Sequence, residues 1–210
     1  MLDLLEECKW IEQRYEKDFI DSNLMRAGDG KTKEGDYANY HRISKVYWLT
    51  FIKEEDYERI PNIMKFKKWV KLFKASINKM LYETGHAFEV VSIEEQYLRY
   101  DQGGKFEAHL DTQCNPLKDC IIGKDSHYPR LLTWLVFLNP DWTDADGGLY
   151  HTYYNWPQLD LKEVLTPTLG RGVIIRADKV YHSAELVNTL KRAITLFVNI
   201  KPISQELPQK

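Results

Sequence analysis

The segment FEAHLDTQ, residues 106–113, places a histidine and an aspartate two positions apart, at His109 and Asp111. Side chains alternate along a β-strand, so both would point to one face and could hold a metal ion from one side. A third ligand must then come from another strand, and His182 follows a strand-like run in ADKVYHSAELV. Two histidines and one carboxylate form the facial triad that is typical of Fe(II) sites with open coordination positions. These three residues therefore predict an iron site.

A His-x-Asp pair is a weak signal by itself, because chance produces it in many chains and polar residues also alternate along exposed strands. A cation nine or ten residues after His182, at Lys191 or Arg192, strengthens the interpretation. A buried cation without a partner is costly, so its ligand is expected to carry a carboxylate. The pattern thus predicts a metal ion with an anion bound opposite it.

The composition sets limits on the class of protein. The 210 residues are enough to bury a core, and 43% hydrophobic with 29% charged residues is ordinary for a globular protein. With 29 basic and 31 acidic residues, the chain has no global electrostatic reason to bind nucleic acid or a membrane. We find no apolar run of a membrane span and no basic start of a signal peptide. Three cysteines without a CxxC pair favour a reducing compartment, so we predict a cytoplasmic protein.

The elements that would position the candidate ligands change in type along the chain. Helices are predicted over 3–20 and 61–83, where apolar residues recur at helical spacing. Residues 21–40 are polar and contain glycines, which indicates a long loop or flap, and a strand is expected over 43–51. From residue 87 on, β-branched and aromatic runs separated by glycine turns predict strands over 88–100, 105–111, 130–139, 148–154, 172–177 and 192–200.

Two helices followed by a series of strands predict a mainly β fold in which the helices flank an antiparallel double-sheet barrel. Helical periodicity does not interrupt the later strands, which excludes an alternating βαβ arrangement. Because repeats and linkers are missing, one domain over 1–210 is expected. Residues 1–85 would supply helical support with an early strand and a flap, and 86–201 would form the jelly-roll core.

Several segments resemble, in order, the core motifs of the 2-oxoglutarate- and Fe(II)-dependent dioxygenases, and above all the prolyl 4-hydroxylase-like branch. The segments are YLRYDQGGKFEAHLD, LLTWLVFLNPDWTDADGGLY and HSAELVNTLKRAITLF, and RISKVYWL resembles the early strand. Recurrent pairs of that branch stand here as Leu138-Asn139, Asp141-Trp142 and Gly147-Gly148-Leu149. The likeness extends over roughly residues 40 to 200 and implies a double-stranded β-helix, which is a distorted jelly roll.

The resemblance also implies how a co-substrate would bind. His109, Asp111 and His182 would bind Fe(II) at one mouth of the barrel. 2-Oxoglutarate would chelate the iron, and its far carboxylate would reach Lys191 or Arg192. Strand parity favours Lys191, since it places that residue on the same face as Ala193 and Thr195, with Arg192 opposite.

Two further residues are candidates for binding the co-substrate. Tyr100 resembles a tyrosine that contacts 2-oxoglutarate, although a core aromatic residue would fit this position equally well. Thr133, if it faces inward, is expected to hydrogen-bond the far carboxylate. The chain also departs from the oxygen-sensing branch, because 112–129 is a longer insert and Val136 stands where a tyrosine often assists 2-oxoglutarate binding. The insert is expected to act as a substrate-gripping flap, as is the loop 21–40.

The favoured function is therefore hydroxylation of an aliphatic C–H bond, with a prolyl residue in a protein or peptide as a candidate substrate. The alternatives are a hydroxylase of a free amino acid or small biosynthetic intermediate, and a non-catalytic β-barrel that binds a ligand. The implied cofactors are Fe(II), 2-oxoglutarate and O₂, and ascorbate is a further candidate. Nucleic acid and membrane partners are not expected, and the sequence leaves the oligomeric state open.

Overall fold

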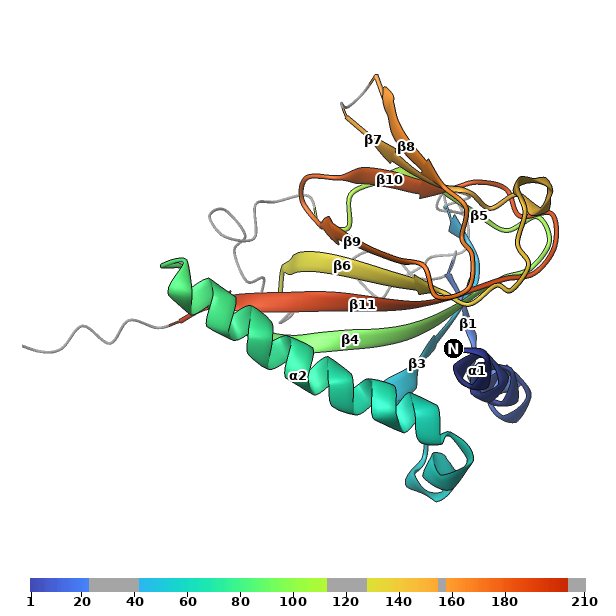
Figure 1. Cartoon of the computed structure of the whole chain (residues 1–210), viewed down its shortest axis with the longest axis horizontal. Coiled ribbons are helices and arrows are strands. Elements are labelled where there is room, and N and C mark those ends of the chain that lie inside the picture. The colour runs from blue at the N-terminus through green and yellow to red at the C-terminus, as the bar shows by residue number, and fades with distance from the viewer. Residues whose placement is uncertain (23–41, 113–127, 155–157, 204–210) are drawn as a thin grey trace, which may run out of the picture.

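The computed structural model describes residues 1–22, 42–112, 128–154 and 158–203. Two antiparallel sheets lie one above the other, and both long helices lie outside the larger sheet (Figure 1). This mainly β architecture confirms the predicted fold class. The predicted flap over 21–40 and the insert over 112–129 fall almost entirely outside the described residues.

Six strands form the larger, major sheet, and five form the smaller, minor sheet. The major sheet has the order β1 (Ile20–Asp21), β3 (Lys45–Trp48), β4 (Phe88–Tyr100), β11 (Lys191–Pro202), β6 (Arg130–Phe137) and β9 (Gly172–Arg176). The minor sheet has the order β2 (Arg42–Ile43), β5 (Lys105–His109), β10 (Tyr181–Ala184), β7 (Tyr150–Tyr153) and β8 (Leu161–Leu165). The strands β8 and β10 are not among the predicted ones, since β8 is mostly exposed and β10 has four residues.

Helix α2 spans Pro61–Glu83, as predicted, and α1 spans Leu2–Arg14, which is shorter than predicted. Proline suits the first turn of α2, because its fixed φ matches the helix and its missing N–H would have no partner there. The carboxylate of Glu7 on α1 accepts hydrogen bonds from the backbone N–H groups of Asn62 and Ile63, at 2.9 and 2.7 Å. The start of one helix is thereby held by the other. Short 3₁₀ turns lie at Glu16–Asp18, Leu49–Phe51, Glu54–Arg59 and Asp144–Asp146.

The core has a helix-side part and a part between the sheets. The helix-side part packs α1 and α2 on the outer face of the major sheet and includes Leu5, Ile11, Tyr47, Ile63, Ile194 and Leu196. The part between the sheets includes Val46, Leu98, Phe137, Tyr150, Val187 and Ala193. Strand β11 supplies residues to both parts because alternate side chains point to opposite faces.

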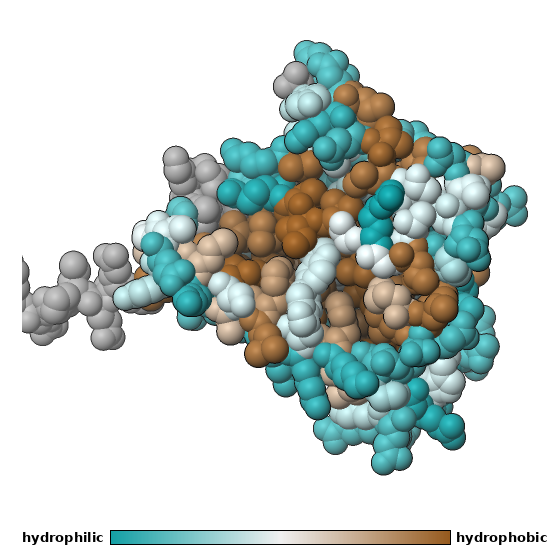
Figure 2. Space-filling view, in the orientation of Figure 1, coloured by the Kyte–Doolittle hydropathy of each residue, from teal (hydrophilic) through white to brown (hydrophobic). Residues whose placement is uncertain are grey.

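Two lysines of α2 are tied to neighbouring backbone. Lys67 donates to the carbonyl of Leu49 in the 3₁₀ turn after β3 at 3.2 Å, and Lys74 donates to that of Val91 on β4 at 2.7 Å. Above α2 in Figure 2, hydrophobic side chains gather on the surface, and Ile174 on β9 is one exposed apolar residue. The described part of the chain holds no helix that is long and apolar enough to cross a membrane.

Candidate active site

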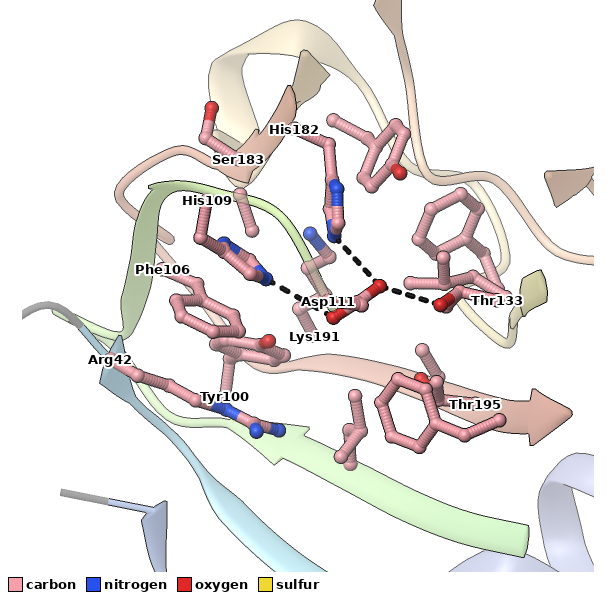
Figure 3. A pocket seen from close by; sticks show the side chains of 17 residues that line it. Arg42, Tyr100, Phe106, His109, Asp111, Thr133, His182, Ser183, Lys191 and Thr195 are labelled. Atoms are coloured by element: carbon pink, nitrogen blue, oxygen red, sulfur yellow. Dashed lines mark hydrogen bonds and ion pairs between the residues drawn. The ribbon is translucent and has the colours of Figure 1, made fainter. Parts of the chain in front are cut away.

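A cavity lies between the two sheets (Figure 3). Strands of both sheets and the segment after β5 line it. Its polar lining includes Tyr100, His109, Asp111, Thr133, Tyr150, His182, Lys191 and Thr195. All six residues that the sequence proposes for metal or co-substrate binding therefore meet in this one cavity.

His109, Asp111 and His182 converge at the centre of the view in Figure 3. The Nε2 atoms of His109 and His182 lie 3.4 Å from the two carboxylate oxygens of Asp111, one on each side. The three ligand atoms all lie within 4.8 Å of one another. Asp111 follows the end of β5 at His109, so a bend after the strand, rather than strand alternation alone, brings the carboxylate inward.

Both imidazole rings are oriented by the backbone. Nδ1 of His109 is 2.7 Å from the carbonyl oxygen of Glu107, and Nδ1 of His182 is 3.0 Å from that of Val180. A carbonyl can only accept, so each Nδ1 carries the hydrogen and each Nε2 presents its lone pair to the site. The Nε2 atom of His109 is buried and has no hydrogen-bond partner in the part of the chain that the structure describes. Metal-binding histidines show this arrangement, in which the second ring nitrogen is tied to a carbonyl or carboxylate.

The protonation states also suit a metal. Burial raises the pKa of Asp111, but the neighbouring His182 and His109 outweigh it and hold that pKa well below its usual value. Burial lowers the pKa of His182 to about 4, although the Asp111 carboxylate opposes this. At neutral pH an anionic carboxylate thus stands beside a neutral imidazole, and these are the forms that bind a metal ion.

Thr133 faces the cavity, as predicted, and its contact with the co-substrate stays a prediction. Its hydroxyl donates to Oδ2 of Asp111 at 2.6 Å, so it also holds that carboxylate. Buried ligand carboxylates are usually oriented in this way by a neighbouring group. A sequence alone gives no sign of this pair, since the two residues are 22 positions apart.

A bulge in β5 lets two of its residues face the cavity. His182 pairs with His109, but Ala184 pairs with Phe106, so three residues of β10 (182–184) lie opposite four of β5 (106–109). An extra residue of this kind re-aims the side chains of a strand. As a result both Phe106 and His109 line the cavity, and their rings stack at 3.6 Å between centroids. Strict alternation would place them on opposite faces, which is why Phe106 was not predicted.

Lys191 and Arg192 point in opposite directions from β11. Lys191 lines the cavity and is 1% exposed, and its Nζ donates to the carbonyl oxygen of Gly148 at 2.5 Å. Burial lowers its pKa to about 7. Arg192 lies on the other face and forms a two-pronged ion pair with Glu12 of α1, at 2.8 and 3.1 Å. Among the described residues Lys191 has no carboxylate partner.

The aromatic residues near Lys191 differ in part from the predicted set. Its Nζ lies 5.3 Å from the ring centre of Tyr100 and 5.5 Å from that of Phe137. Phe137 therefore occupies the cavity position that the sequence assigned to Val136. Val136 faces the other way, because β6 turns Thr133, Leu135 and Phe137 inward. Tyr150 on β7 also lines the cavity and is not among the predicted site residues. The sequence signal that points to it is its place on the strand that follows the Gly147-Gly148 turn.

Comparisons with known proteins agree with this architecture. A prolyl-4-hydroxylase from Pseudomonas putida is 16% identical, with 94% of this chain and 86% of that chain covered and a TM-score of 0.61. A prolyl hydroxylase from Trichoplax adhaerens, solved with a peptide fragment of the hypoxia inducible factor oxygen degradation domain, is 18% identical. In that case 94% of this chain and 76% of that chain are covered, with a TM-score of 0.68. At these identities the likeness shows a shared fold.

Sequence comparison gives the family. No match was found among curated proteins. The model of the 2OG-Fe(II) oxygenase superfamily matches residues 95–199, which is half of the chain and contains all six candidate residues. The enzymes of this superfamily use Fe(II), 2-oxoglutarate and O₂, and the two-histidine, one-carboxylate cluster suits iron. The chain belongs to the 2OG-Fe(II) oxygenase superfamily.

Proposed function

We propose that this oxygenase hydroxylates an aliphatic C–H bond of a prolyl residue within a protein or peptide. The observation that carries the oxygenase chemistry is the convergence of His109, Asp111, His182 and Lys191 in one cavity. The prolyl part is supported by the relatives, since both are prolyl hydroxylases and one is bound to a peptide fragment.

In this proposal Asp111 and the two histidines beside it, His109 and His182, hold Fe(II). The unpartnered Nε2 of His109 and the oriented rings fit such an ion, as does the anionic carboxylate. When bound, the iron supplies the oxidative chemistry by which O₂ and 2-oxoglutarate yield succinate, CO₂ and a hydroxylated substrate. His109, Asp111 and His182 would supply three ligands, and a site of this kind keeps open positions for a co-substrate and oxygen.

Other residues would bind and orient the co-substrate. Lys191 offers its buried ammonium group to the cavity, where a bound carboxylate would favour its charged form. Apolar side chains of Leu98, Leu135 and Phe137 line the space between and exclude water. Water exclusion strengthens the attraction between Lys191 and a carboxylate and limits side reactions.

The test is a screen for one added oxygen atom by mass spectrometry. The protein is incubated with Fe(II), 2-oxoglutarate and two panels, one of proline-containing peptides and one of free amino acids. We expect the added mass on a peptide with wild-type protein, and none with His109→Ala. The matched control is His151→Ala, which removes a histidine of β7 that is paired with Glu185 at 3.3 Å.

Two results would count against the proposal. Oxygen added only to a free amino acid would show that the peptide assignment is wrong while the chemistry stands. Undiminished succinate formation by His109→Ala would show that the iron is held elsewhere.

A further inference from the structure

Three polar side-chain atoms of the cavity lining are buried and have no hydrogen-bond partner among the described residues. They are Nε2 of His109, Oγ1 of Thr195 and the hydroxyl of Tyr150. The proposed iron accounts for His109. A buried hydroxyl without a partner costs about 1–3 kcal/mol, so such groups usually meet a ligand or water. Tyr150 is 2% exposed, which makes it a buried donor within the cavity.

Tyr150 lies next to Phe137, which also adjoins Lys191, and its ring centre is 5.5 Å from that of His182. The carbonyl of Gly148, which accepts the hydrogen bond from Lys191, is two residues before Tyr150. The approach is close, because a Cβ on Gly148 would lie 3.0 Å from Cδ of Lys191. The ring of Tyr150 is 6.0 Å from that of Phe137, and Lys191 Nζ is 5.5 Å from the same Phe137 ring. The phenol and the ammonium group therefore both adjoin Phe137.

We propose that Tyr150 binds 2-oxoglutarate, by donating a hydrogen bond to the far carboxylate that Lys191 neutralises. This inference rests on the proposed function. A lysine acts as a point charge and does not fix the plane of a carboxylate as the fork of an arginine does. A second donor from a facing strand fixes that plane. Phe137 carries no hydroxyl and cannot do so. Tyr100 also adjoins the ammonium group, but its hydroxyl is not one of the buried atoms without a partner.

Thr195 is less suited to this role. It lies four residues after Lys191 on β11, which is roughly 13 Å further along an extended strand. Its short side chain therefore lies well away from the Lys191 end. The longer phenol of Tyr150 starts two residues after Gly148, and its ring adjoins the rings of Phe137 and His182.

The experiment measures binding of 2-oxoglutarate by calorimetry, without O₂ and with Mn(II) in place of Fe(II). Tyr150→Phe removes only the hydroxyl and keeps the ring. We expect the dissociation constant to rise about tenfold, as for the loss of one hydrogen bond to a charged group. Tyr47→Phe is the matched control, because the Tyr47 hydroxyl is also buried and unpartnered but lies in the helix-side core. That variant should bind 2-oxoglutarate like wild type.

A second ligand identifies the end of the molecule that Tyr150 contacts. 2-Oxobutanoate keeps the chelating group but has no far carboxylate, so Tyr150→Phe and wild type should bind it equally. An unchanged affinity of Tyr150→Phe for 2-oxoglutarate would overturn the inference, and so would an equal loss for both ligands. If wild-type protein with Mn(II) does not bind 2-oxoglutarate at all, the proposed function fails instead. Thermal unfolding of Tyr150→Phe checks that the fold is intact.

Discussion

Lys191 and Arg192 are neighbours on β11, yet they lie in opposite surroundings. Lys191 faces the cavity between the sheets, and within the described residues its hydrogen bond goes to a backbone carbonyl, that of Gly148. Arg192 faces α1 on the helix side, where Glu12 binds it with two hydrogen bonds and Tyr97 donates to the same carboxylate at 2.5 Å. One strand thus carries a cation without a carboxylate on one face and a fully paired cation on the other.

The pKa values of the two residues move in opposite directions. Burial lowers the pKa of Lys191 to about 7, because no anion compensates for the loss of water. Burial also acts to lower the pKa of Arg192, but the hydrogen bonds and charge of Glu12 outweigh it and raise that pKa. From this difference we infer that Arg192 stabilises the fold by joining α1 to the sheet, whereas Lys191 is available to bind an anionic ligand.

Alanine substitutions at the two positions should separate these roles most strongly. Lys191→Ala should weaken 2-oxoglutarate binding about a hundredfold, since a charged hydrogen-bond donor to the carboxylate is lost. Arg192→Ala should leave binding nearly unchanged but destabilise the fold by about 3 kcal/mol, because Glu12 is left buried without its partner. Calorimetry with Mn(II) and thermal or urea unfolding measure the two effects.

The Lys191→Ala variant also has a stability expectation. Its removal takes away a buried, unpaired charge, so the free energy of unfolding should stay the same or increase. If Arg192→Ala loses 2-oxoglutarate affinity and Lys191→Ala does not, the assignment of the two faces is wrong.

Thr133→Val extends the comparison to the metal end of the cavity. The valine keeps the shape but removes the hydroxyl that donates to Asp111. We expect metal affinity to fall about tenfold, as is usual when a group that orients a ligand is removed. Competition with a fluorescent chelator measures this affinity. Thr152→Val is the control, because Thr152 is also buried and its hydroxyl has no hydrogen-bond partner among the described residues. An equal loss of metal affinity in Thr152→Val would show that Thr133 does not position Asp111.

Much of the fold followed from the sequence because its signals are local. The apolar stripe and Pro61 predicted α2 at its observed bounds, and the glycine turns separated the later strands. Parity along β11 is also local, and the structure turns Lys191 inward and Arg192 outward. The division into 1–85 and 86–201 stays a prediction, and β3 of the first part pairs with β4 of the second.

The parts that could not be read from the sequence depend on departures from regular strands or on distant contacts. The bulge in β5 brings Phe106 to the side of His109, and alternation gives no warning of an extra residue. The contact of Thr133 with Asp111 depends on how the sheets close. Tyr150 was overlooked because a tyrosine in an aromatic-rich strand is usually a core residue.

The smallest expected effect is a pH dependence that belongs to Lys191 alone. A carboxylate is held by the protonated ammonium group, and the pKa of this group in the free protein is about 7. The charged form is therefore available below pH 7 and is progressively lost above it, so 2-oxoglutarate affinity should fall about fivefold between pH 7 and pH 8. Binding should also take up a proton in this range, which calorimetry in two buffers of different ionisation enthalpy detects. Lys191→Arg should show neither effect, because a guanidinium stays protonated throughout this pH range. A wild-type affinity that does not change over the same range would show that Lys191 is fully charged even without a bound anion.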